Sequence, residues 1–103
     1  MPREYDKLVR DRIPDIVEAN GERPVTHVAE GEEYDRRLAE KLDEEVAEFR
    51  DSGDPEELAD VLEVVYALAA RAGVSRDELE RLRTEKVDER GGFEDGVVLE
   101  RVE

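Results

Sequence analysis

The sequence has no cysteine and no tryptophan, and it contains a single methionine. Without cysteine the chain can form neither a disulfide nor a thiolate zinc site. The longest wholly apolar run, residues 64–70, is far shorter than the roughly 20 residues that a membrane span needs. The opening residues MPREYDKLVRDR are charged and lack the apolar region of a signal peptide. We therefore expect a cytoplasmic protein without a membrane partner.

Positive charge is also scarce. Acidic residues outnumber basic ones by 31 to 16, the net charge is −15, and the only lysines are Lys7, Lys41 and Lys86. A surface this acidic repels phosphate backbones, so we expect no nucleic-acid partner. Much acid with little lysine also suits concentrated salt, in which ions screen the self-repulsion of the chain, and a halophilic host is therefore a hypothesis.

The remaining pattern is helical. With 103 residues and neither repeats nor a linker, the chain predicts one domain, residues 1–103. Ile13, Ile16 and Val17 have helical spacing, and Gly21 is a natural stop. Helical periodicity continues over residues 32–50, over residues 55–72 after the N-cap Asp54, and up to residue 90 after a capping box that begins at Ser75.

Two short segments look extended, residues 24–28 and residues 97–102, and they could pair with each other. The predicted fold class is therefore mainly all-α, an antiparallel helical bundle with a minor β element. The apolar face of the helix at 55–72 is wider than one neighbouring helix can cover. We therefore expect a homodimer or a higher homo-oligomer.

Four carboxylates stand out. Glu45 falls in the middle of the apolar stripe of its helix, where a lone charge is costly unless it is paired or bound to a metal. In an antiparallel hairpin, Glu48 and Glu57 lie at one level, and Glu45 and Asp60 lie at the next, roughly 9 Å from the turn. Two helices with axes about 8–10 Å apart can share a cation between such side chains.

The sequence therefore predicts a metal site formed by Glu45, Glu48, Glu57 and Asp60. Ligands that are all oxygen favour Mg²⁺, or Mn²⁺, over softer metals. A structural interpretation stays open for three of the four. Glu57 can serve as a helix cap, and Glu48 and Asp60 can be ordinary solvated acids in a chain that carries 31 of them.

Glu44-Glu45-x-x-Glu48 followed by Glu57-x-x-Asp60 resembles the EExxE and ExxD motifs of the MazG-like all-α nucleoside triphosphate pyrophosphohydrolases. The segments YDKLVRDRIP, ELADVLEVVYAL and ERGGF, in this order, further resemble a small subfamily described as phosphoribosyl-ATP pyrophosphohydrolase-like. The resemblance extends from Tyr5 to Phe93.

The resemblance implies Mg²⁺-dependent cleavage of a nucleotide between its α and β phosphates, with Glu44 orienting the attacking water. Lys7, Arg10, Arg12 and Lys86 are the candidates for binding phosphate. We expect Lys86 to lie on the inward face of its helix, and Arg90 is a weaker candidate. Lys41 can neutralise the acidic cluster, and His27 is expected to be structural.

Two other functions remain open. A phosphoribosyl-ATP pyrophosphohydrolase of histidine biosynthesis would use the same site chemistry. A non-catalytic acidic interaction module would instead spread its carboxylates over the surface.

Overall fold

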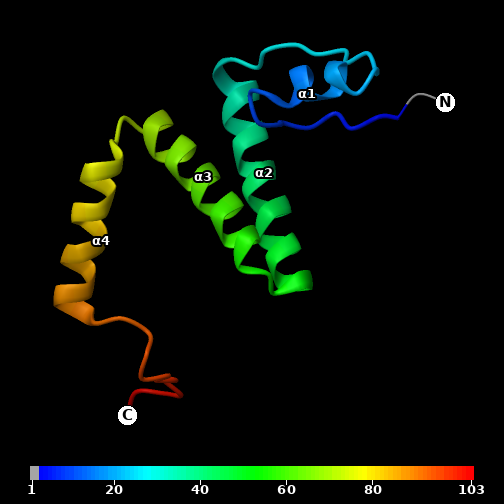
Figure 1. The fold of residues 1–103 in the computed structure, drawn as a ribbon. Coiled ribbons are helices and arrows are strands. Elements are labelled where there is room, and N and C mark those ends of the chain that lie inside the picture. Colours follow the sequence, from blue (N-terminus) through cyan, green and yellow to red (C-terminus); the bar gives the residue numbers. More distant parts are fainter. Residues whose placement is uncertain (1–2) are drawn as a thin grey trace.

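The computed structural model describes residues 3–103, and its regular structure consists of four helices (Figure 1). They are α1 (Ile13–Ala19), α2 (Gly31–Ser52), α3 (Pro55–Arg71) and α4 (Arg76–Arg90). The predicted all-α class is confirmed, and the helix ends lie within two residues of the predicted ones. None of the helices within residues 3–103 combines the length and the apolar composition that crossing a bilayer requires.

Local sequence signals explain where the three long helices begin and end. Gly53 adopts a left-handed conformation with φ of 68° and donates its N–H to the Phe49 carbonyl at 2.7 Å, which ends α2. The Asp54 carboxylate accepts a hydrogen bond from the Glu56 N–H at 3.0 Å and starts α3. Ser75 caps α4 in the same way, through the Glu78 N–H. The turn between α2 and α3 is therefore as tight as the sequence predicts.

The core lies between α2 and α3, which form an antiparallel hairpin (Figure 1). Leu38 of α2 is 2% exposed and Val64 of α3 is 8% exposed, and both are buried in this hairpin. Glu45 of α2 is buried as well, at 6% exposed. The prediction that Glu45 occupies the core-facing stripe of α2 is thus confirmed.

The predicted bundle does not close within one chain. Helix α4 contacts α3 but not α2 within the described residues, and none of its residues is buried (Figure 1). The radius of gyration is 18.0 Å, whereas a compact domain of this length has about 13 Å. The molecule is therefore extended, and helix faces that a bundle would bury are exposed.

The predicted β element is also not formed. Residues 3–103 contain no strand, and the pairing of residues 24–28 with residues 97–102 is not present. The reason is geometric, since α4 carries the C-terminal tail away from the loop that precedes α2 (Figure 1). The apolar side chains of the tail, such as Val97 and Leu99, are accordingly exposed.

Candidate metal centre

The hairpin brings the predicted carboxylates together from two helices. The carboxylate oxygens of Glu45, Glu57 and Asp60 lie within 4.8 Å of one another. A second group, Glu44, Glu45 and Glu48, meets the same limit. Glu45 belongs to both groups, so it is the centre of what we call the carboxylate cluster, which consists of Glu44, Glu45, Glu48, Glu57 and Asp60.

Glu45 has an incomplete set of partners. Its Oε1 lies 3.0 Å from the Lys41 Nζ, on the preceding turn of α2. Its Oε2 is buried and has no hydrogen-bond partner within residues 3–103. A buried acceptor without a partner costs about 1–3 kcal/mol, and more when it is charged. This oxygen is therefore the observation within the cluster that points to a cation as its partner.

Electrostatic repulsion marks the α3 side of the cluster. Desolvation raises the pKa of Glu57 above the usual range, and the negative charges of Glu48, Asp60 and Glu45 raise it further. A divalent cation among these oxygens would offset the repulsion with its positive charge, and each carboxylate could then stay ionised. The residues present therefore fit a hard metal ion.

Glu44 has a different environment from its neighbours. Lys7 Nζ lies 2.7 Å from its Oε1, and Lys41 Nζ lies 3.0 Å from its Oε2. Desolvation alone would raise the pKa of this carboxyl, but the hydrogen bonds from the two lysines outweigh it and lower the pKa. Conversely, desolvation opposes the positive charge of Lys41, while its bonds to Glu45 and Glu44 raise its pKa. Both groups are therefore held in their charged forms.

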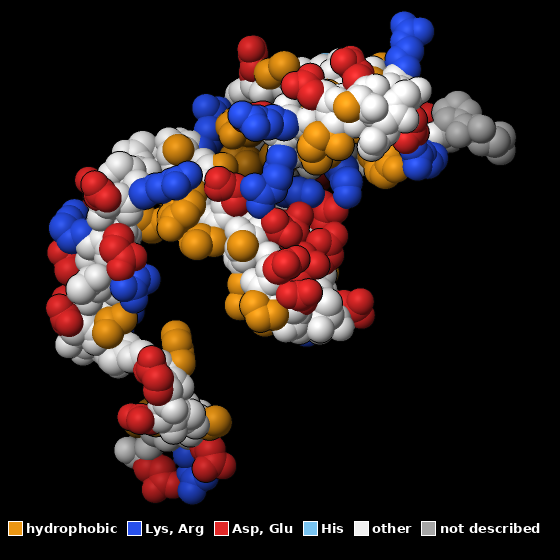
Figure 2. All heavy atoms as spheres, in the orientation of Figure 1, with side chains coloured by type: hydrophobic (Ala, Val, Ile, Leu, Met, Phe, Trp, Pro, Cys, Tyr) orange, Lys and Arg blue, Asp and Glu red, His pale blue; other side chains and the backbone are white. Residues whose placement is uncertain are grey.

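Two of the four predicted phosphate-binding residues reach the cluster. Lys7 contacts Glu44, and Arg10 Nη2 lies 2.7 Å from the Asp60 Oδ1. Both belong to the segment that precedes α1 and crosses the hairpin. Figure 2 shows basic side chains beside the acidic ones where this segment meets α2.

The other two do not reach it. Arg12 is exposed at the N-cap of α1 and makes no ion pair with a cluster carboxylate within residues 3–103. The prediction that Lys86 faces inward is wrong for the single chain, because α4 stands apart from α2 and Lys86 is exposed. Arg90, at the last position of α4, is exposed as well.

The structure adds one contact that sequence analysis missed. Arg37 Nη1 donates to the Asp6 carbonyl oxygen at 2.7 Å, and Nη2 donates to the Asp6 Oδ1 at 2.9 Å. Arg37 precedes Lys41 and Glu45 at four-residue spacing, so all three lie along one face of α2. This four-residue spacing is the sequence signal that could have placed Arg37 beside the cluster. His27 lies outside the cluster, and its Nε2 lies 2.8 Å from the Glu33 Oε2.

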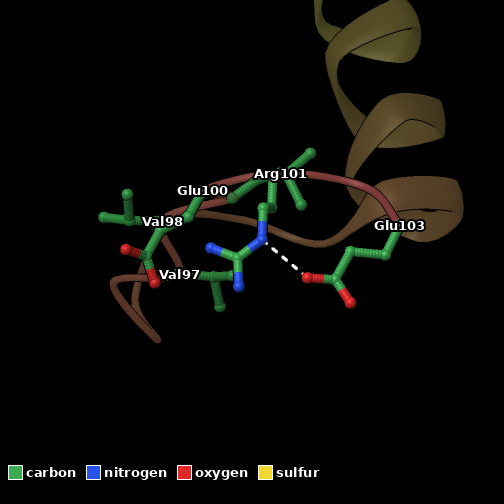
Figure 3. Close-up of a pocket in the computed structure, with 6 residues that line it drawn as sticks. Val97, Val98, Glu100, Arg101 and Glu103 are labelled. Atoms are coloured by element: carbon green, nitrogen blue, oxygen red, sulfur yellow. Dashed lines mark hydrogen bonds and ion pairs between the residues drawn. The ribbon is translucent and has the colours of Figure 1, made fainter.

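A hollow elsewhere in the molecule is not a competing site. It is formed by the tail alone, where Arg101 Nε donates to the Glu103 Oε1 at 2.7 Å (Figure 3). The residues around it are exposed and all come from one segment without regular structure. They are Val97, Val98, Leu99, Glu100, Arg101 and Glu103.

Part of the chain is similar to a known protein. An uncharacterised protein of Mycolicibacterium smegmatis is 52% identical over 44 residues, which are 43% of this chain and 45% of that protein. The match thus spans about half the length of the curated relative. No family model matches the chain, and no solved structure matches it.

Proposed function

We propose that this protein is an Mg²⁺-dependent nucleotide pyrophosphohydrolase that cleaves the bond between the α and β phosphates of a nucleoside triphosphate. The products would be a nucleoside monophosphate and pyrophosphate. The observation that carries the proposal is the unpartnered, buried Oε2 of Glu45 among carboxylates contributed by two helices. The resemblance to the MazG-like enzymes supplies the reaction.

The cluster suits a nucleotide because its charges are mixed. Glu45, Glu48, Glu57 and Asp60 would hold Mg²⁺ or Mn²⁺, which when bound would offset the charge of the phosphates and of the departing pyrophosphate. Lys7 and Arg10 stand at the edge of the cluster and would bind phosphate oxygens. Without a bound metal ion, a chain of net charge −15 would repel a triphosphate.

Glu44 is the proposed catalytic residue. Its carboxylate would accept a hydrogen bond from water and take up the proton as the water oxygen bonds to the α-phosphorus. The bond from that phosphorus to the bridging oxygen breaks, and its electron pair leaves with pyrophosphate. Because Lys7 and Lys41 lower the pKa of Glu44, this carboxylate is a weak base, and its main contribution would be to orient the water.

We also propose that the chain forms a homodimer, in which a second copy covers the exposed apolar side chains of α3 and α4. Large apolar side chains of α3 and α4 are exposed, among them Leu58, Leu62, Leu82 and Val87. Figure 2 shows hydrophobic side chains on the face of α3 that is turned toward α4. Since Leu38 and Val64 are the only buried apolar side chains among residues 3–103, a homodimer would supply further burial.

Pyrophosphate release tests the enzymatic function. A panel of standard, deaminated and oxidised nucleoside triphosphates, with phosphoribosyl-ATP included, should yield pyrophosphate in the presence of Mg²⁺ or Mn²⁺. Turnover confined to phosphoribosyl-ATP would assign the protein to histidine biosynthesis. Glu45→Gln and Asp60→Asn should abolish turnover while Glu40→Gln, an exposed position of the same helix α2, should keep it. The absence of turnover across the whole panel would contradict the proposal.

A further inference from the structure

The segment before α1 is attached to the hairpin through charged side chains. We call residues 3–12 the N-terminal arm. Arg37 of α2 binds Asp6 of the arm through two hydrogen bonds, Lys7 binds Glu44, and Arg10 binds Asp60. Two of these attachments thus end on carboxylates of the cluster.

The attachments differ in strength. The Asp6 side chain is 79% exposed, but Arg37 is only 12% exposed and donates to both the backbone carbonyl and the carboxylate of Asp6, and this double attachment makes it the firmest one of the arm. The side chains of Lys7 and Arg10 are 41% and 57% exposed, and each reaches the cluster through one ion pair. Exposed pairs of this kind contribute little and exchange readily. The arm is therefore held at Asp6 and can be released at Lys7 and Arg10.

Charge explains why such an arrangement is useful. Five carboxylates meet in the cluster, and Lys41 is the cation that α2 itself provides there. The arm adds two further positive charges to Glu44 and Asp60, but it leaves the buried Oε2 of Glu45 without a partner. It therefore compensates the outer part of the cluster and leaves the inner part open to another cation.

We infer that the N-terminal arm is a displaceable internal counter-ion, whose Lys7 and Arg10 neutralise Glu44 and Asp60 until a divalent cation binds and then turn to the phosphates of the nucleotide. This inference rests on the proposed function. The arm and the metal compete for the same negative charges, whereas the arm and the phosphates attract each other. Loss of the two arm cations must therefore have opposite effects on the binding of metal alone and on the binding of phosphate.

Calorimetry on the full-length protein measures both effects. In Lys7→Gln combined with Arg10→Gln, Mg²⁺ alone should bind about tenfold more tightly than in the unmodified protein, since two partly exposed ion pairs no longer compete. Inorganic pyrophosphate added with saturating Mg²⁺ should bind about tenfold more weakly, because its cationic partners are lost. The matched control is Arg3→Gln combined with Arg36→Gln. This control also removes two positive charges, one from the arm and one from α2, at residues that pair with Glu22 and Glu40 and not with the cluster. It should change the affinities for Mg²⁺ and for pyrophosphate less than about twofold.

Release of the arm has its own signal. The chain contains no tryptophan, so Tyr5→Trp introduces a single reporter beside Lys7, whose Nζ lies 5.9 Å from the centre of the Tyr5 ring. Addition of Mg²⁺, which does not itself quench fluorescence, should change the emission intensity of this tryptophan as Lys7 leaves its ring, at the concentration at which calorimetry detects binding. In the Lys7→Gln and Arg10→Gln background, which lacks the ammonium beside the ring, the emission intensity should not respond to Mg²⁺.

The outcomes separate this inference from the proposed function. If Mg²⁺ binds but the double variant binds it no more tightly and the emission of the tryptophan at position 5 is constant, the arm is a fixed structural element and the inference is wrong, while the metal site stands. If neither the unmodified protein nor the double variant binds Mg²⁺ or Mn²⁺, the metal site and the arm mechanism both fail.

Discussion

Lys41 Nζ lies 3.0 Å from the Oε1 of the buried Glu45 and leaves the Oε2 of the same carboxylate without a partner. The Lys41 ammonium thus pairs with one oxygen of the Glu45 carboxylate, and the other oxygen could bind a second cation. The ammonium of Lys41 also contacts Glu44 at 3.0 Å, so its charge is divided between two carboxylates. The hairpin is therefore under-compensated at its centre, and each prediction about the cluster follows from that deficit.

Lys41→Met should destabilise the metal-free protein. The variant keeps the length of the side chain and removes the one ion-pair partner that Glu45 has within residues 3–103. We expect a loss of about 1–2 kcal/mol, less than for a fully buried pair because Lys41 is partly accessible. Urea unfolding in EDTA measures it. Lys86→Met, an exposed lysine of α4, is the matched control and should change the free energy of unfolding little. An equal effect of both substitutions would show that the Lys41 pair contributes nothing specific.

Mg²⁺ should stabilise the protein through Glu45. A ligand at one hundred times its Kd adds about 2.7 kcal/mol to the free energy of unfolding, so Tm should rise on addition of Mg²⁺ and fall again with EDTA. Glu45→Gln should abolish the rise while circular dichroism remains that of the folded helices, because an uncharged amide removes the repulsion together with the ligand. Glu40→Gln should retain the full rise. A rise that persists in Glu45→Gln would place the ion elsewhere.

Acid should weaken the junction between the loop that precedes α2 and the helix itself. The hydrogen bond with His27 lowers the pKa of Glu33, with desolvation opposing it and Arg37 adding to it. Because the pKa of Glu33 is lower in the folded state, its carboxylate stabilises the fold at pH values above its unfolded-state pKa of about 4.5. This contribution is lost as the pH falls below that value toward the lower pKa of the folded state.

The test of this acid effect compares two neighbouring positions. Glu33→Gln should lower Tm at neutral pH, and the difference from the unmodified protein should shrink as the pH falls below 4.5. Glu32→Gln, at an exposed position in the same first turn of α2, should show neither effect. A difference that is constant with pH would mean that the Glu33 charge is not involved.

Self-association should depend on the exposed apolar face of α3. Leu62 is exposed in the single chain, so Leu62→Asp should leave the monomer folded but dissociate the proposed homodimer. Sedimentation velocity over a range of protein concentrations distinguishes the two states. Leu99→Asp, in the exposed tail, is the control and should not change the sedimentation coefficient. A monomeric unmodified protein at every concentration would refute the dimer.

Much of the helical structure could be predicted because its signals are local. Asp54 with Pro55, and Ser75 with Glu78, mark helix starts through contacts within one turn, and the structure contains those contacts. The burial of Glu45 was predictable for a similar reason, since helical periodicity alone places it on the stripe of Leu38. The strand pairing of the tail failed because it required contacts between segments far apart in the sequence, which no local pattern specifies.

The candidate site likewise has features that local sequence patterns predict and features that depend on contacts between separate segments. The order of residues determined which carboxylates share a helix face and how far each lies from the turn, because the rise and the twist of a helix are constant. Only the tertiary structure decided that the arm crosses α2, that Arg37 anchors it at Asp6, and that Lys7 and Arg10 rather than Lys86 meet the acids. Those contacts join separate segments whose relative position depends on packing and charge summed over the whole chain, and periodicity within one helix carries no record of that sum.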